Sequence, residues 1–239
     1  MSTYFALIVS LLLVALARPA GAAAIEVAPV VHELPAGRTA MAMTVTNRGD
    51  ASVTMQLRAY TWQQRDGQDL LEPAPELVVA PAIFELAAGR SQVVRAVLRL
   101  PVGSAAAEVE RSYRLLLDEL PGAPLAGQVR MTLRISMPVF ALPAKPEAAH
   151  IAWHVDPASQ SLVASNSGGR RERIRELALI AADGHRLPLA QGAHPYVLAG
   201  AARHWSLAEA GPAWPAGQKL MVSALIDSGR VEVPLAFVP

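Results

Sequence analysis

GQVRMTLRISMPVFALP, from Gly127 to Pro143, is the stretch of this chain that decides its fold. Large apolar side chains occupy every second position from Val129 to Val139, and polar residues or proline fill the positions between them. A two-residue period is that of a β-strand with one apolar face. Strands usually number about five or six residues, so this one carries more apolar surface than its own sheet needs. It is either a long core strand of a β-sandwich or a strand lent to another protein.

Length and composition place the chain among globular proteins. Its 239 residues suit two domains of about 100 residues each. With 52% hydrophobic and 17% charged residues, the chain can bury a core and is not disordered. A formal net charge of +1 gives no sign of a nucleic-acid binder. The absence of cysteine excludes disulfides, thiolate metal ligands and cysteine nucleophiles.

Residues 1–24 predict a secretory signal peptide. The apolar run from Phe5 to Ala17 is too short to span a bilayer comfortably, and Arg18 and a region of small residues follow it. We expect cleavage after Ala22 or Ala24. Because no later run resembles a membrane helix, the mature chain is expected to be exported without being inserted into a membrane.

Seven β-like runs follow the signal, separated by turn residues such as Asn47-Arg48-Gly49-Asp50 and Arg65-Asp66-Gly67. Seven strands are typical of an immunoglobulin-like sandwich. The runs are Ile25 to Val31, Arg38 to Thr46, Val53 to Trp62, Leu77 to Phe84, Gln92 to Leu100, Tyr113 to Glu119 and the long segment from Val129.

A second β domain is predicted after the prolines of Leu142-Pro143-Ala144-Lys145-Pro146, which indicate a stiff linker. No later stretch has the length and period of a substantial helix. We therefore predict an all-β chain with a signal peptide (1–24), an N-terminal domain (25–142), a linker (143–146) and a C-terminal β-sandwich (147–239). The second set of strands is Gln160 to Asn166, Ile174 to Ile180, Arg186 to Leu189, His204 to Leu207, Lys219 to Asp227 and Val231 to Val238.

Four motifs in the N-terminal domain resemble the periplasmic pilus-assembly chaperones of the chaperone/usher pathway. Each motif is weak alone, but their order and spacing, after a signal peptide and before a second β domain, are fairly specific. They are VTNRGD (Val45 to Asp50), APAIFELAAGRSQVVRAVL (Ala80 to Leu98), ERSYRLLLDELP (Glu110 to Pro121) and LRISMPVFALP (Leu133 to Pro143).

The resemblance implies two immunoglobulin-like domains in an L-shaped arrangement with a cleft between them. It implies a periplasmic chaperone that folds and caps pilus subunits and delivers them to an outer-membrane usher. The long strand would be the donor, inserted into a pilin that lacks its final strand, and Val129, Met131, Leu133 and Ile135 would fill the groove of the pilin. Such a role needs no catalytic residue, metal or cofactor. It leaves open which subunit is bound and whether the free chaperone dimerises to cap its own strand.

The resemblance departs from the best-known members in the cleft. Those chaperones hold the terminal carboxylate of the subunit with two basic residues, and the matching positions here are Val31 and Pro138. YRLLLDELP together with RISMPVF is more similar to the archaic branch, whose subunits resemble spore-coat protein U. The resemblance then suggests Arg114 as a substitute anchor and Arg111 as the second candidate, since a guanidinium can donate two hydrogen bonds to a carboxylate. The alternative is that Arg114 is a solvated strand residue.

Other charged residues match a second feature of the family. Arg95, Glu110 and Asp227 fall where the resemblance implies a salt-bridge network between the two domains, and an arginine fork can bridge two carboxylates. The alternative is three unrelated surface charges. The charge-rich segment from Arg170 to Glu176 is predicted to be a solvated strand edge.

Two rival functions remain. The chain could be a secreted immunoglobulin-like structural or adhesive subunit that is itself assembled, or a periplasmic hydrolase. The hydrolase is disfavoured because His150 and His154 lie in strand-like sequence, where a four-residue spacing does not present two metal ligands as it would on a helix. We therefore expect no enzyme.

Overall fold

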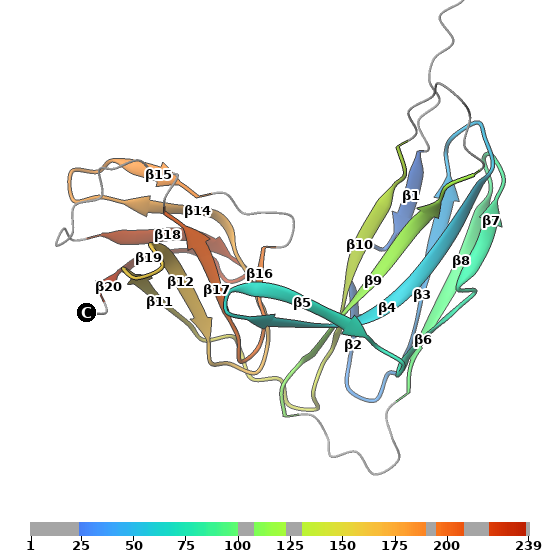
Figure 1. Cartoon of the computed structure of the whole chain (residues 1–239). Coiled ribbons are helices and arrows are strands. Elements are labelled where there is room, and N and C mark those ends of the chain that lie inside the picture. The colour runs from blue at the N-terminus through green and yellow to red at the C-terminus, as the bar shows by residue number, and fades with distance from the viewer. Residues whose placement is uncertain (1–23, 100–107, 123–130, 190–194, 208–219, 238–239) are drawn as a thin grey trace, which may run out of the picture.

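The structure, a computed structural model, describes residues 24–99, 108–122, 131–189, 195–207 and 220–237. All regular secondary structure in these ranges is β-strand, which confirms the all-β class (Figure 1). None of the residues described forms a helix that is long and apolar enough to cross a membrane. The predicted signal peptide and Val129 lie outside the described residues.

The N-terminal domain is a sandwich of two sheets. One sheet has the order β1-β3-β8-β6, with β1 Ile25–Ala28, β3 Ala40–Asn47, β8 Ser91–Leu98 and β6 Leu77–Ala80. The other has the order β2-β10-β9-β4-β5, with β7 beside β4. Its strands are β2 His32–Leu34, β10 Arg134–Ala141, β9 Arg111–Leu120, β4 Val53–Arg65, β5 Gln68–Pro73 and β7 Ile83–Leu86.

Alternation along each strand explains how this sandwich closes. In β9 the odd-numbered Tyr113, Leu115 and Leu117 are buried in the core between the sheets. Met137 and Val139 of β10 join the same core, as the sequence period predicts. Residues two positions apart lie on the same face of a strand. The even-numbered residues of β9 and β10 therefore face away from the core.

The first strand of the domain is divided between the two sheets. β1 pairs antiparallel with β3, whereas β2 pairs in parallel with β10. The prediction of one strand from Ile25 to Val31 is wrong. The strand ends at Ala28, and the chain changes sheets between Ala28 and His32. As a result β2 covers only the last three residues of β10, Val139 to Ala141.

The C-terminal domain packs three sheets, of four, two and four strands, around its own core. Their orders are β17-β12-β11-β20, β13-β16 and β15-β14-β18-β19. The core contains Trp153 and Trp205 among aliphatic side chains. The strands are β11 Ile151–Asp156, β12 Ser161–Asn166, β13 Glu172–Arg173, β14 Arg175–Ile180, β15 Arg186–Pro188, β16 Tyr196–Val197, β17 Ala202–Ser206, β18 Met221–Ile226, β19 Gly229–Pro234 and β20 Ala236–Phe237.

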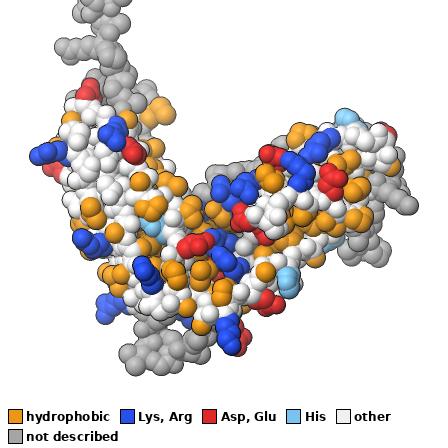
Figure 2. Space-filling model, turned by 180° about the vertical axis from the view of Figure 1, so that it is seen from behind, with side chains coloured by type: hydrophobic (Ala, Val, Ile, Leu, Met, Phe, Trp, Pro, Cys, Tyr) orange, Lys and Arg blue, Asp and Glu red, His pale blue; other side chains and the backbone are white. Residues whose placement is uncertain are grey.

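The two sandwiches meet at one end and diverge, and the space-filling view shows the hollow between them (Figures 1 and 2). A hairpin that the sequence did not predict spans the junction. β4 continues to Arg65, beyond the predicted end at Trp62, and turns through Asp66 and Gly67 into β5. Both turn residues have positive φ, 51° and 74°, as a type I′ hairpin turn requires. The hairpin reaches across to β17 of the C-terminal domain, and Gly67 forms an isolated bridge with Arg203.

Candidate functional site

The apolar face of β10 runs from the core of the N-terminal domain out to solvent. Met137 and Val139 are fully buried, Leu133 and Ile135 are half-buried, and the side chain of Met131 lies 89% exposed. These residues share one face because they alternate along the chain. The predicted donor residues that the structure describes therefore extend the core face beyond the domain, although the strand itself begins only at Arg134.

The backbone of β10 is open along the same stretch. The N–H of Glu119 donates to the carbonyl of Leu133 at 2.8 Å, so the odd-numbered residues of β10 turn their backbone groups toward β9. By the alternation of an antiparallel ladder, Arg134 and Ser136 turn theirs to the opposite side. No described strand pairs with β10 there, because β2 pairs with β10 only from Val139 to Ala141. An unpaired edge beside exposed apolar side chains is a template for a further strand.

Arg171, from the C-terminal domain, holds the base of this sheet. Its guanidinium donates to the carboxylate of Glu110 at 2.6 Å and also binds Glu33 on β2. It stacks 3.6 Å from the ring centroid of Phe140 on β10. The backbone joins the same contact, since the N–H of Glu110 donates to the carbonyl of Gly169 at 2.9 Å. One side chain thus ties two strands of the N-terminal domain, and the residue that precedes β9, to the second domain.

Burial dominates the electrostatics of Glu110. Its side chain has no exposed surface. Burial raises the pKa of Glu110 above the ordinary value, and the charge and hydrogen bonds of Arg171 oppose that rise. The prediction of a solvated edge from Arg170 to Glu176 is wrong at this point, because Arg171 and Glu172 are nearly inaccessible and Ile174 is a core residue.

The predicted network of Arg95, Glu110 and Asp227 does not form. Arg95 lies exposed on the outer face of the sheet that contains β8, and Glu110 precedes β9 in the other sheet. Asp227 contacts Arg175 of its own domain at 3.4 Å. The prediction placed a glutamate correctly at the domain junction but gave it the wrong cation, since Arg171 takes the place assigned to Arg95.

Arg114 faces away from the core, because it alternates along β9 with the core residues Tyr113 and Leu115, but it is closed off from solvent. Only 1% of the residue is exposed, and its guanidinium stacks 3.6 Å from the ring centroid of Trp62. Burial lowers the pKa of Arg114 to about 10. Arg114 is therefore neither a solvated strand residue nor an accessible anchor for a carboxylate, because an aromatic cluster between the domains covers it. That cluster consists of the rings of Trp62, Phe140 and Tyr196, with Leu198 packed against them.

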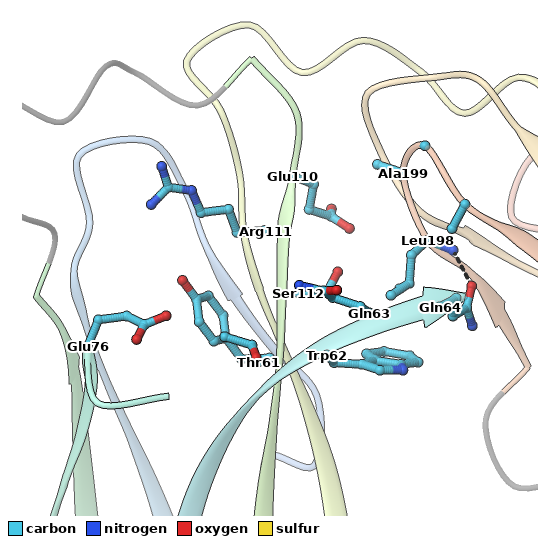
Figure 3. A pocket seen from close by; sticks show the side chains of 13 residues that line it. Thr61, Trp62, Gln63, Gln64, Glu76, Glu110, Arg111, Ser112, Leu198 and Ala199 are labelled. Atoms are coloured by element: carbon cyan, nitrogen blue, oxygen red, sulfur yellow. Dashed lines mark hydrogen bonds between the residues drawn. The ribbon is translucent and has the colours of Figure 1, made fainter. Parts of the chain in front are cut away.

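Arg111 lines a cavity of about 500 Å³ at the junction of the domains. Figure 3 shows its side chain and that of Glu110 on opposite sides of β9. Glu76 lies on the same side as Arg111, and both contribute to the environment of Tyr113, whose pKa is raised by burial and by Glu76. Two carboxylates therefore line the cavity beside a single arginine, which makes it a poor receptor for an anion.

The hairpin of β4 and β5 forms the other contact between the domains. The side-chain amide of Gln64 donates to the carbonyl of Tyr196 at 2.9 Å and accepts from the N–H of Leu198 at 3.0 Å. At the tip, a methyl group added to Gly67 would lie 2.5 Å from Cγ of His204. The sequence contained the signal for this hairpin, an Asp-Gly pair with β-like sequence before it, but β5 has only one half-buried residue and no apolar period.

Gly67→Ala is therefore expected to lower the free energy of unfolding by about 1–3 kcal/mol, since a positive φ and a close contact both oppose the new methyl group. Urea unfolding measures the loss. Gly37→Ala is the matched control, because Gly37 has a φ of 80° with open space around it. Equal losses in the two variants would show that the contact with His204 contributes nothing.

The described residues contain no group of three or more histidine, aspartate or glutamate side chains that could hold a metal ion. What they contain is an open strand edge with an apolar face, at one side of a hollow between two sandwiches whose junction is fixed by Arg171 and the hairpin. This arrangement suits the binding of an extended polypeptide rather than the turnover of a small molecule.

Comparison with solved structures identifies the fold. The CsuC–CsuE chaperone–tip adhesion subunit pre-assembly complex from archaic chaperone-usher Csu pili of Acinetobacter baumannii matches with a TM-score of 0.64 and 20% identity, covering 91% of this chain and 100% of that chain. The E. coli chaperone DraB matches with a TM-score of 0.60 and 18% identity, covering 90% and 97% of the two chains. The Salmonella enterica SafA pilin in complex with the SafB chaperone matches at 0.60 and 15% identity, covering 91% and 97%. These likenesses confirm two immunoglobulin-like domains.

Sequence comparison identifies the family. Comparison with curated protein sequences gave no significant match. The model of the family described as "Pili and flagellar-assembly chaperone, PapD N-terminal domain" matches residues 24–147, just over half of the chain, and takes in every strand from β1 to β10. The chain therefore belongs to the PapD-like family of pilus-assembly chaperones.

Proposed function

We propose that the protein is a periplasmic chaperone that caps pilus subunits by donating the start of β10 as a missing strand. The observation that carries the proposal is the coincidence, on one strand, of an open backbone edge and an apolar face that emerges from the core at Met131 and Leu133. A subunit that lacks a strand exposes a groove with the complementary needs, unpaired ladder groups and apolar pockets.

Apolar burial can hold a subunit tightly while leaving it able to dissociate. Burying each large aliphatic side chain contributes roughly 1.5–3 kcal/mol before ordering is counted. Val129, Met131, Leu133 and Ile135 together would provide enough to hold a subunit while leaving the contact non-covalent. Methionine suits this role because its flexible side chain adapts to pockets of different shape.

Delivery to an outer-membrane usher follows as part of the same proposal. The leader at residues 1–24 supports export, with cleavage after Ala22 or Ala24. The similarity to the Csu chaperone complex, together with the departures at Val31 and Pro138, supports the archaic branch and subunits that resemble spore-coat protein U. The proposed activity requires no cofactor.

Co-purification from the periplasm tests the proposal against its rivals. A chaperone is expected in one-to-one complexes with a pilus subunit encoded beside it. A structural or adhesive subunit would form polymers, and a hydrolase would be recovered alone, so either result would contradict the chaperone proposal. The mass of the purified free chain also tests whether it dimerises.

The anchor for the terminal carboxylate of the subunit needs a cation that is exposed near the open edge. Arg114 is buried, and Arg111 shares its cavity with two carboxylates. Arg170 fits better. Its side chain is 37% exposed, and the two carboxylates beside it, Glu33 at 3.8 Å and Glu110 at 4.0 Å, each bind Arg171 at closer range. We propose Arg170 for this role.

Arg170→Ala is expected to weaken the complex by about 1.5–3 kcal/mol, the scale of a hydrogen bond to a charged group. Arg111→Ala is the control and should change affinity little. Affinity is measured with the natural subunit and with one whose terminal carboxylate has been displaced by added residues. If Arg170→Ala weakens both complexes equally, Arg170 does not bind the carboxylate.

A further inference from the structure

The first residues of β10 are held by two consecutive acidic residues of β9, Asp118 and Glu119, which point to opposite faces of the strand. On the face away from the core, the carboxylate of Asp118 accepts hydrogen bonds from Nε of Arg134 and, at 2.7 Å, from the guanidinium of Arg58 on β4. One carboxylate thus bridges three neighbouring strands at the point where β10 begins.

Glu119, which points to the opposite face of β9 from Asp118, binds the backbone of Leu133, the residue before Arg134. Its backbone N–H donates to the carbonyl of Leu133 at 2.8 Å, and its side-chain carboxylate accepts from the N–H of Leu133 at 3.3 Å. Both backbone groups of Leu133 are therefore bound before the regular ladder starts at Arg134. Leu133 lies between the exposed Met131 and the start of β10, so these bonds hold the backbone at the point where the strand begins.

The charge state of Asp118 favours this arrangement. Burial alone would raise its pKa, but hydrogen bonds from Arg134 and Arg58 outweigh burial, and the net pKa is lowered. Asp118 is thus ionised at neutral pH. Both arginine side chains are substantially exposed, 42% for Arg58 and 61% for Arg134. Exposed ion pairs add little to the free energy of folding. The importance of Asp118, Arg58 and Arg134 therefore lies in where they hold the chain, at the start of β10.

We propose that Asp118 and Glu119 are positioning residues that order the backbone from Leu133 to Ile135 before a subunit arrives. The inference rests on the proposed function, because the ordered segment is the proposed donor. A donor segment that is already extended loses less conformational freedom when a partner strand adds to it, and ordering of this kind speeds association. Contacts within the finished complex stay the same, so dissociation is unaffected.

Asp118→Asn tests the proposal, because it keeps the shape of the side chain and removes its charge. Amide hydrogen exchange in the free chaperone is expected to be about tenfold faster at Leu133 and Ile135. Association is followed by diluting denatured subunit, recovered from the wild-type complex, into chaperone. We expect about three- to tenfold slower association with an unchanged dissociation rate.

Two further variants complete the experiment. Arg134→Met removes the partner charge and keeps an apolar stem, so it should reproduce the effect, and the double variant should be no worse than either single variant. Glu26→Gln breaks the exposed pair with Arg48 on the other sheet and serves as the control, with no change in either rate.

Unchanged exchange in Asp118→Asn would overturn the proposal without reference to any subunit. Faster dissociation with unchanged association would also overturn it, because Asp118 or Arg134 would then contact the subunit directly. A different variant shows whether β10 is the donor strand at all. If it is not, Met131→Asp would retain subunit binding, whatever Asp118→Asn does to amide hydrogen exchange.

Discussion

Met131→Asp and Leu133→Asp are expected to abolish subunit capture while leaving the chaperone folded. Each replacement removes roughly 1.5–3 kcal/mol of apolar burial and would place a charge in an apolar pocket, so we expect affinity to fall by at least about 100-fold. The fold should survive because Met131 is almost fully exposed in the free chain. Recovery of subunit from the periplasm measures capture, and thermal unfolding measures the fold.

Two controls separate the face of the strand from the general effect of charge. Thr132→Asp adds the same charge on the neighbouring, exposed position of the opposite face and should bind normally. Met131→Leu keeps an apolar side chain of similar volume and should also bind. The donor assignment is wrong if Met131→Asp protects subunits from periplasmic degradation as well as Thr132→Asp does.

Arg171→Ala is expected to lower the free energy of unfolding by about 3–5 kcal/mol, because it leaves the buried carboxylate of Glu110 without its cation. The variant should also loosen the angle between the domains, since Arg171 contacts β2, β10 and Glu110 together. Urea unfolding and solution X-ray scattering measure the two effects. Adding Glu110→Gln should restore part of the lost stability by removing the buried charge.

The same variant has a characteristic pH dependence. Burial already raises the pKa of Glu110, and loss of Arg171 removes the interaction that opposes the rise. A carboxyl whose folded pKa lies above its unfolded value binds protons more readily in the folded state, so its unfavourable contribution disappears as pH falls through that folded pKa. The deficit of Arg171→Ala should therefore narrow on acidification.

The neighbouring arginine supplies the control for stability. Arg170→Ala should change the free energy of unfolding by no more than about 1 kcal/mol, because its side chain is partly exposed and its ion contacts are long. If Arg170→Ala and Arg171→Ala unfold at the same urea concentration, with equal dependence on urea, Arg171 does not hold the domains together.

Strand periodicity predicted most of the fold because it is a local property. The alternation from Met131 to Val139 placed Met137 and Val139 on the core face of β10, although Phe140 on the opposite face is buried as well, against Tyr196 of the second domain. The same alternation could not show that β2 would leave part of β10 unpaired, since pairing depends on where the first strand changes sheets.

The contacts between the domains were predicted poorly because each depends on residues far apart in the chain. Glu110 and Arg171 are separated by 61 positions, and a run of arginines after two glycines is indistinguishable from a solvated strand edge until its partner is known. Arg95 was chosen by motif alone, and the sheet that contains it faces the wrong way. Arg114 carried a charge that suggested exposure, yet an aromatic cluster covers it.

The open edge of β10 also bears on how often one molecule can be used. A subunit bound in the proposed way would occupy only the side of β10 that β9 does not, so its departure would break no bond of the sheet to which β10 belongs. Val139 to Ala141 would remain paired on both sides throughout. The chaperone would return unchanged after each release, and a small periplasmic pool of it could serve a long succession of subunits.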